Sequence, residues 1–512
     1  MKIIDTSEMD PDQLSLNDAY WVYNGLDCCL TMEVKESLEG RLCPTTRATY
    51  EQAMRVQAPF LDMMLRGLTV DDHNRNKASK QYEAIYNQLE QGFNRLCVGG
   101  LGLEAPINIK SHIQVKWLIF DVLDVPEGSF KKRNPKTGKR ERSSDRETLE
   151  KISALYMWAE PFCNFILAMR DASKSLGFLR TELDADRKIR CSFNIAGTNT
   201  GRLSSSFSDF GTGTNLQNVT PILRTIFVPE PGKVFVNVDL EQADSRNVGA
   251  LCWEYFLESH GPEFAGAYLD ACESGDLHTT VSRMAYTDLP WGTEPDRAIA
   301  DRLAYRDLSY RDLSKKLGHG TNYYGQPKTM AMHSKLPVQQ IVDFQSNYFG
   351  AFPCIPAWHE HTINKLQTTG ELTHLYGRKR RFYGRLDNQN VINAAIAYCP
   401  QGMTGEEINH GILQLWRDPR FELLVQVHDS ILFQIDQREI DILVPLALEL
   451  LKAPITLKGG REFFVPLEAM VGWNWGYQGP DNPHGLAKWR GEETRKPPRR
   501  LPPIKRSIRD LL

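Results

Sequence analysis

The segment LLVQVHDSILFQI, at residues 423–435, constrains the fold of this chain more than any other part. Two apolar runs flank a polar centre, His428–Asp429–Ser430, which is the pattern of two strands joined by a tight turn. Asp429 therefore lies between runs that will be buried, where a carboxylate is costly unless it is paired or bound to a metal. The segment predicts a β-hairpin with a functional carboxylate at its centre.

A second carboxylate occurs in VNVDLEQADSR, at residues 236–246, where a β-branched run ends in Asp239 and a helical pattern follows. A carboxylate at the end of a buried strand is well placed to hold a hard cation. For this segment alone, a turn residue that ends the strand is an equally good interpretation. If the fold brings Asp239 and Asp429 together, they could hold two metals about 3.5–4 Å apart, the arrangement that serves phosphoryl transfer.

The third segment is RDLSKKLGHGTNYYG, at residues 311–325. On a helix, Arg311, Lys315 and His319 share one face, with Tyr323 next along it. Cations suit the charged tail of a triphosphate, and an aromatic plane suits a base. A lone basic helical stripe is usually solvated surface, but beside two aspartate segments it favours a nucleotide site.

Composition sets wider limits. At 512 residues the chain suits several domains, with 41% hydrophobic and 24% charged residues. The net charge of −3 excludes a uniformly basic surface, yet basic runs at 131–142, 378–381 and 488–509 allow a phosphate-tracking groove. The stretch 127–146 is expected to be an exposed loop. With no membrane span, no signal-peptide pattern and no Cys-x-x-Cys spacing among ten cysteines, we expect a cytoplasmic protein with reduced thiols, in the host cytoplasm if it is viral.

The three segments resemble, in order and spacing, the three polymerase motifs of family A DNA polymerases, the relatives of DNA polymerase I. Further segments match family landmarks: NIAGTNTGRLSSS (194–206), NLQN (215–218), DLHT (276–279), YFGAFPCIPAW (348–358) and PQGMTGEEIN (400–409). The resemblance covers about residues 14–478. It implies an α+β right-hand fold with an antiparallel-sheet palm and helical fingers and thumb. It also implies primer-dependent, template-directed DNA synthesis from deoxynucleoside triphosphates.

The resemblance further implies a division of the chain into parts. These are a remnant of a 3′–5′ exonuclease domain (1–45), a thumb (46–190), a palm in two pieces (191–260 and 395–478), fingers (261–394) and a basic, Pro-rich tail (479–512).

By the same resemblance, Asp239 and Asp429 coordinate two Mg²⁺ ions, which Mn²⁺ can replace, and Lys315 is catalytic. Asp244 stands where the family usually has Glu, so we expect ribonucleotides to be rejected less strictly. Tyr324 is an apparent insertion, which leaves Tyr323 and Tyr324 as alternatives for one role. The residues implied to bind the nucleotide are Arg311, His278, His319, Tyr323 and Asp244. Those implied to bind primer–template DNA are Arg202, Asn215, Gln217, Asn218, Gln401, His428 and Arg378.

The N-terminal segment YNGLDCCLTMEV, at residues 23–34, resembles the last motif of the proofreading exonuclease, through Tyr23 and Asp27. That chemistry also needs an earlier Asp-x-Glu pair, and the 22 preceding residues contain none. We therefore expect that this chain does not proofread alone, and that a separate exonuclease subunit or a processivity factor can be a partner. A solvated helix residue is an equally good interpretation of Asp27.

HGTNY and V-H-D-S resemble bacteriophage versions of the motifs, which indicates a role in phage DNA replication. Two alternatives stay open: a single-subunit RNA polymerase-like nucleotidyltransferase, and an inactive DNA-binding remnant. Intact Asp239, Asp429, Arg311 and Lys315 speak against the remnant.

Overall fold

A computed structural model describes residues 15–134, 138–209, 212–305 and 308–491. At its centre lies a five-stranded sheet in the order β12-β13-β7-β16-β17, in which every neighbouring pair is antiparallel. The hairpin predicted at 423–435 is confirmed as β12 and β13. The strands of this sheet are β7 (Lys233–Leu240), β12 (Glu422–Val427), β13 (Ser430–Asp436), β16 (Leu467–Gly472) and β17 (Ala487–Lys488).

The register of the sheet places three acidic positions at one end. Asp239 of β7 lies opposite Ser430 of β13 on one side and opposite Glu468 of β16 on the other. The backbone N–H of Leu240 donates to the carbonyl oxygen of Asp429 at 3.1 Å. Because directly opposed residues project to the same face, Asp239 and Glu468 share a face of the sheet.

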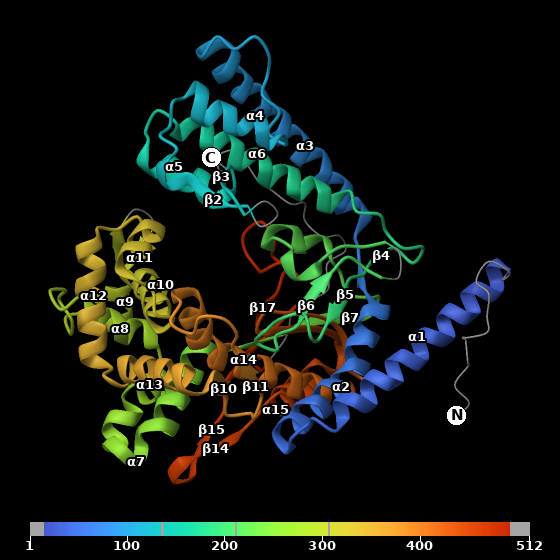
Figure 1. The fold of residues 1–512 in the computed structure, drawn as a ribbon, viewed down its shortest axis with the longest axis vertical. Helices are drawn as coiled ribbons and strands as arrows, with labels where there is room; N and C mark the ends of the chain where they lie inside the picture. Colours follow the sequence, from blue (N-terminus) through green and yellow to red (C-terminus); the bar gives the residue numbers. More distant parts are fainter. Residues whose placement is uncertain (1–14, 135–137, 210–211, 306–307, 492–512) are drawn as a thin grey trace.

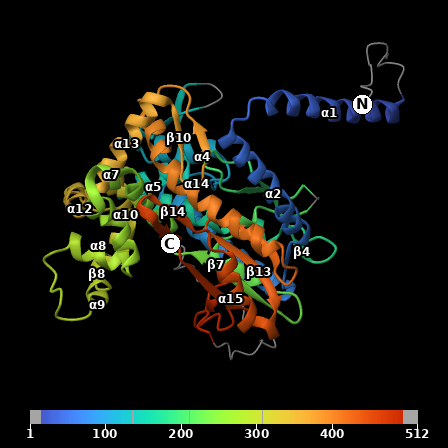
Figure 2. The ribbon, with the colours of Figure 1, turned by 90° about the horizontal axis from the view of Figure 1, so that it is seen from below.

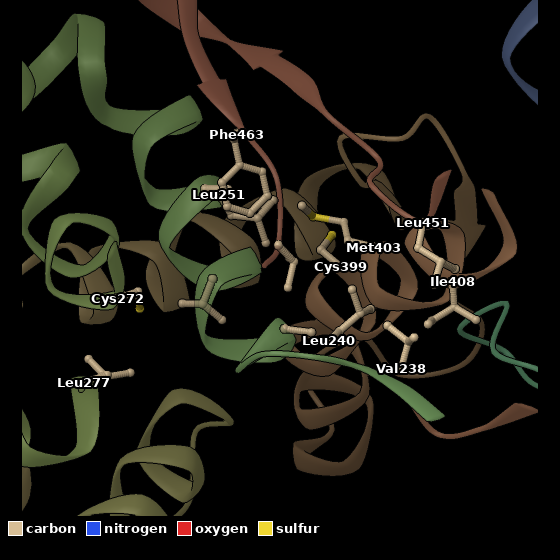
Figure 3. Packing of buried hydrophobic residues seen from close by; sticks show 14 of the residues in the cluster. Val238, Leu240, Leu251, Cys272, Leu277, Cys399, Met403, Ile408, Leu451 and Phe463 are labelled. Carbon is tan, nitrogen blue, oxygen red and sulfur yellow. The ribbon is translucent and has the colours of Figure 1, made fainter. Parts of the chain in front are cut away.

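Four helices pack over one face of the central sheet, and a second buried cluster, in which Phe235 of β7 lies with Leu216 and Phe227, covers the other face. Val238 and Leu240 of β7 lie in one buried cluster with Met403 and Ile408, as Figure 3 shows, and each is at most 3% exposed. This burial explains why β7 reads as a nearly continuous apolar run in the sequence. The covering helices are α2 (Pro44–Arg66), α7 (Ala243–Glu273), α14 (Gln389–Trp416) and α15 (Ile440–Leu450).

A second helical group packs beside the sheet, on the side of α7, and contains the predicted basic helix (Figures 1 and 2). That helix, α10, begins at Ser309, whose side chain forms a capping box with Asp312. The group comprises α8 (Leu277–Ala285), α9 (Asp296–Ala300), α10 (Tyr310–Asn322), α11 (Pro327–Ser334), α12 (Val338–Ala351) and α13 (Cys354–Thr369).

A third helical group has a hydrophobic core of its own and stands above the sheet in Figure 1. Leu89 and Phe93 of α3 pack there with Ile166 and Met169 of α6, all at most 1% exposed. The helices are α3 (Asp72–Asn94), α4 (His112–Trp117), α5 (Arg146–Leu155) and α6 (Glu160–Leu179).

The basic stretch 127–146 corrects one expectation, because it contains a two-stranded hairpin where an exposed loop is predicted. Lys131 of β2 (Lys131–Arg133) pairs with Arg142 of β3 (Arg140–Arg142). The Arg142 guanidinium reaches the carboxylates of Asp121 and Glu127, and the latter also pairs with Lys131. These carboxylates offset the like charges that oppose strand pairing.

Ten short strands form the remaining two-stranded pairs, each antiparallel. They are β1 (Leu68–Thr69) with β4 (Lys188–Ile189), β5 (Ser192–Asn194) with β6 (Ser204–Ser206), β8 (Leu303–Tyr305) with β9 (Leu308–Ser309), β10 (Glu371–Thr373) with β11 (Lys379–Arg381), and β14 (Ile455–Leu457) with β15 (Arg461–Phe463).

Helix α1 (Leu16–Glu39) differs from all the others because none of its residues is buried. In both views it extends away from the sheet and from the α10 group (Figures 1 and 2). Among the helices within the described ranges, none is both long and apolar enough to span a bilayer.

Candidate active site

A cleft of about 620 Å³ opens between the acidic end of the sheet and helix α10. Asp239 and Asp429 line it from the sheet, and Lys315 and His319 line it from α10. Asp244, at the start of α7, and His278, at the start of α8, complete the predicted residues on its wall. The structure thus brings together the three segments that the sequence separates widely.

The two aspartates form an electrostatically costly pair. Burial, followed by the negative charges of Asp429 and Glu468, raises the pKa of the Asp239 carboxyl to about 7. Burial also raises the pKa of Asp429 above its ordinary value. Like charges that are held together in a partly buried site favour either protons or a bound cation.

This donor set fits hard divalent cations. Mg²⁺ is typically held by one or two carboxylates and completes its coordination with water and substrate phosphates. Within the described ranges, no three acidic, imidazole or thiol side chains come close enough to form a metal cage of their own. The pair of aspartates therefore fits ions that also bind a substrate phosphate better than a structural metal.

Asp429 is positioned by a two-residue turn between the paired residues Val427 and Ser430. The first turn residue, His428, has φ = 56°, in the left-handed region that non-glycine residues rarely adopt. The Gln426 side-chain amide donates to the His428 carbonyl at 2.5 Å, and the Ser430 hydroxyl donates to the Val427 carbonyl at 3.0 Å. Two long flanking strands hold a conformation that costs about 1–2 kcal/mol.

The predicted phosphate-binding side chains of α8 and α10 differ in how available they are to a ligand in this structure. Lys315 lines the cleft directly, and its positive charge lowers the pKa of Asp239. Arg311 is held by Asp276 through two hydrogen bonds, at 2.8 and 3.0 Å. Burial, and then the charges of Arg311 and Lys315, lower the pKa of His278 to about 4. His278 is therefore a neutral imidazole at physiological pH.

Asp244 is the centre of a second group of contacts, at the start of α7. The Arg202 guanidinium donates to Asp244 Oδ1 at 2.8 Å and to the Gln401 carbonyl at 3.2 Å. The Thr404 hydroxyl also donates to Asp244 Oδ1, at 3.1 Å. Arg202 and Gln401, both predicted to contact DNA, are thus joined to each other. Arg202 also joins them to Asp244, which is predicted to bind the nucleotide.

The structure separates the two tyrosine alternatives. Tyr324 has φ = 60° and, as the residue after the C-cap, closes a Schellman turn: its N–H donates to Thr321 and that of Gly325 donates to Gly320. Its ring packs edge-on against His359, away from the candidate site. The hydroxyl of Tyr323 is buried, and burial followed by the charge of Asp244 raises its pKa. Tyr323 is therefore the tyrosine beside Asp244.

Other predicted DNA contacts make bonds within the fold. Asn215 caps a short turn and bonds to Ser205, and the Gln217 amide donates to the Gln426 side chain at 3.0 Å. Arg378 pairs with Glu406 at 2.6 Å. Asn218 lines a smaller pocket of about 210 Å³, beside α6.

Tyr23 and Asp27 lie outside the cleft, on helix α1. The Tyr23 side chain is 65% exposed, and Asp27 is also exposed. Figures 1 and 2 show this helix remote from α10.

Sequence reasoning missed three polar residues at the site. Glu468 lies directly across from Asp239, but only the strand register reveals this. Asp276 belongs to the DLHT segment and captures Arg311, and Glu407 lies buried behind Asp244. For Asp276 the sequence signal was the DLHT segment itself, and for Glu407 it was an acidic pair within the segment PQGMTGEEIN.

The sequence pattern that defines DNA polymerase family A matches residues 73–477. The protein, with its antiparallel sheet and convergent aspartates, therefore belongs to that family.

Curated relatives include the thermostable DNA polymerase I of Thermus thermophilus, 25% identical over 443 residues, which cover 81% of this chain and 47% of the relative. DNA polymerase I of Chloroflexus aurantiacus is 26% identical over 499 residues, covering 90% and 46%. The chain thus spans about half the length of these relatives. A similar solved fold is the POL domain of Pol1 from M. smegmatis in complex with DNA primer-template and dNTP. It has a TM-score of 0.65 and 22% identity, and covers 82% of this chain and 70% of that one.

Proposed function

We propose that this chain is a DNA-directed DNA polymerase that extends a primer with deoxynucleoside triphosphates. The observation that carries the proposal is the convergence of Asp239, Asp429 and Lys315 on one cleft. Membership of family A supports it, as does the similarity to a POL domain that was solved with primer-template and dNTP.

Asp239 and Asp429 would hold two magnesium ions, or manganese in their place. When bound, such ions activate the primer hydroxyl, orient the triphosphate and neutralise the departing pyrophosphate. Asp239 must lose its proton to serve as a ligand, so the site is more competent above pH 7 than below it.

Three side chains of α8 and α10 would bind the triphosphate. Lys315 lies on the cleft wall, where it can contact the phosphates and give a proton to the leaving pyrophosphate. His278, being neutral, can donate one hydrogen bond to an outer phosphate. Arg311 can bind a phosphate only if it first leaves Asp276. This exchange would accompany a movement of α10 when the nucleotide binds.

The remaining roles follow the family pattern. Tyr323 and His319 would lie against the nascent base pair, and Asp244 would meet the sugar. Arg202, Asn215, Gln217, Asn218, Gln401, His428 and Arg378 would contact primer and template. Correspondingly, 46–190 would be the thumb, 191–260 and 395–478 the palm, and 261–394 the fingers. Residues 479–512 would be a basic tail, of which 492–512 lie outside the described residues.

Primer extension tests the proposal directly. The full chain is incubated with primer–template, Mg²⁺ and each nucleotide class, beside Asp429→Ala. Asp436→Ala is the matched control, because Asp436 lies at the opposite end of the same strand and pairs with Arg438. Template-directed extension by wild type and control but not by Asp429→Ala supports the proposal. Equal use of ribo- and deoxynucleotides would favour the RNA polymerase-like alternative, and no extension would favour an inactive remnant.

We further propose a bacteriophage origin, action in the host cytoplasm, and no proofreading by this chain alone. The last point rests on helix α1, where Tyr23 and Asp27 face solvent and no second carboxylate group in the described ranges joins them to form a metal centre. We expect no degradation of single-stranded DNA by the purified chain. A separate exonuclease subunit would restore it on mixing, whereas robust degradation by the chain alone would contradict the proposal.

A further inference from the structure

A network of hydrogen-bonded, largely buried polar side chains lies behind Asp244, between α7 and α14. We call it the buried polar network; its members are Thr404, Asn247, Glu407 and Tyr376. Asn247 and Thr404 are completely buried, and Glu407 is 2% exposed. A carboxyl group in such surroundings is costly unless every hydrogen bond is satisfied. Three successive hydrogen bonds, through Asn247 and Thr404, connect Glu407 to Asp244 on the cleft wall.

The end of the buried polar network nearest the cleft contacts the Asp244 carboxylate. The Thr404 hydroxyl lies 3.1 Å from Asp244 Oδ1 and 3.1 Å from the Pro400 carbonyl, so it can donate to either, and Arg202 reaches the same Asp244 oxygen. The Asn247 side-chain amide in turn donates to the Thr404 hydroxyl at 3.2 Å and to Glu407 Oε2 at 3.3 Å. These two bonds use both amide N–H groups.

The orientation of Asn247 therefore depends on Glu407. Within the described part of the chain, the carbonyl oxygen of the Asn247 side chain has no hydrogen-bond partner. The amide nitrogen is held by Thr404 and Glu407, with the Pro400 carbonyl a more distant acceptor at 3.5 Å. Loss of the Glu407 acceptor would leave a buried N–H unpaired and favour rotation of the amide away from Thr404.

The end of the buried polar network farthest from the cleft is at Tyr376. Its hydroxyl lies 2.8 Å from the Ala453 carbonyl and 3.3 Å from Glu407 Oε1. The Tyr376 hydroxyl can donate to either oxygen, and the Ala453 carbonyl is the nearer one. Burial raises the pKa of Glu407 to about 8, and the hydrogen bonds from Asn247 and Tyr376 act in the opposite direction. The two oxygens of Glu407 thus face two donors, the Asn247 amide and the Tyr376 hydroxyl.

We propose that Glu407 is a positioning residue that fixes the Asp244 carboxylate, through Asn247 and Thr404, and thereby sets how strictly the site rejects a ribose. The inference rests on the proposed function. Asp244 is one methylene shorter than glutamate, so its carboxylate reaches less far and can exclude a 2′-hydroxyl only from a well-defined position. Hydrogen bonds from Arg202 and Thr404 to the same oxygen, Asp244 Oδ1, hold the carboxylate in such a position.

The test compares kcat and KM for a deoxynucleotide and for the matching ribonucleotide, using the full chain. Thr404→Val keeps the shape but removes the bond to Asp244, and we expect the ratio of the two kcat/KM values to fall about tenfold. Glu407→Leu should lower the ratio in the same direction, by about fivefold. Glu407→Gln should stay within about twofold of wild type, because its side-chain oxygen can still accept from the Asn247 amide.

Ile412→Ala is the structural control, because Ile412 is fully buried on the same helix and belongs to the hydrophobic cluster. It should lower Tm and leave the ratio unchanged. An unchanged ratio in Thr404→Val or in a folded Glu407→Leu, or an equal fall in Ile412→Ala, overturns this proposal. If Glu407→Leu does not fold, the near-isosteric Thr404→Val still decides. A wild-type chain that incorporates no nucleotide overturns the proposed function, and this proposal with it, which is a different observation from an unchanged ratio.

Discussion

The cleft and helix α1 each contain an aspartate from a recognisable motif, but their surroundings differ. Asp429 is half-buried between two strands, and it lines one cleft with Asp244 of α7 and Lys315 of α10. Asp27 lies on a helix with no buried residue, where the Thr31 hydroxyl donates to its backbone carbonyl. The comparison shows that a motif becomes a site only where separate elements bring its partners within reach.

The largest difference between the two regions should be in catalysis. Asp429→Ala removes one of two carboxylates that would hold both metal ions, and we expect nucleotide incorporation to fall by at least about a thousandfold. Asp27→Ala should leave the rate within about twofold of wild type. Single-turnover primer extension measures both, and comparable losses in the two variants would erase the distinction.

Lysines of the two regions provide the next test. Lys315→Ala removes the proposed proton donor to pyrophosphate, and kcat should fall about a hundredfold with a smaller change in KM. Lys35, on α1, pairs with Glu39 at the surface, and Lys35→Ala should have no measurable effect. Steady-state kinetics with one nucleotide checks both, and a loss below about threefold for Lys315→Ala would remove it from the chemistry.

The aspartates should also differ in stability without metal. The folded pKa of Asp239, about 7, lies above the unfolded value near 4, so its charged form destabilises the fold as pH rises through 7. At pH 8 in a chelator, Asp239→Asn should therefore raise the free energy of unfolding by about 2 kcal/mol, and the gain should vanish near pH 4. Asp27→Asn should change it by less than about 0.5 kcal/mol.

Denaturant titration at several pH values gives these free energies. Mg²⁺ should stabilise the wild type and have a weaker effect on Asp239→Asn. A gain that persists unchanged at pH 4 would contradict an origin in charge.

The smallest effect is expected for apolar residues of α1. Leu30 is 55% exposed, so Leu30→Ala should change the free energy of unfolding by less than about 0.5 kcal/mol. Leu251 is completely buried in α7, and Leu251→Ala should cost about 2–5 kcal/mol. A large loss for Leu30→Ala in the isolated chain would show that α1 is covered in solution.

Much of the fold could be predicted because its signals are local. The apolar runs around Asp429 define a hairpin, and the spacing of Arg311, Lys315 and His319 places them on one face of a helix. The motifs also identified family A before any contact was known.

The remainder depends on register and tertiary pairing, which a single sequence does not encode locally. Glu468 neighbours Asp239 only because β16 pairs with β7 in one register. Arg311 was predicted to face phosphate, yet Asp276 of another helix holds it. The hairpin formed by β2 and β3 was expected to be a loop, because its like charges obscure the carboxylates that balance them from Asp121 and Glu127.

The pairing of Ser430 with Asp239 has a consequence for motion during a reaction cycle. A slip of one residue between these strands would turn an aspartate toward the opposite face, so the acidic side of the cleft cannot adjust gradually. Under the proposed function, closure on a nucleotide would therefore come from the helical side of the cleft, where the Arg311 contact with Asp276 can be exchanged, while the hydrogen-bonded ladder stays still.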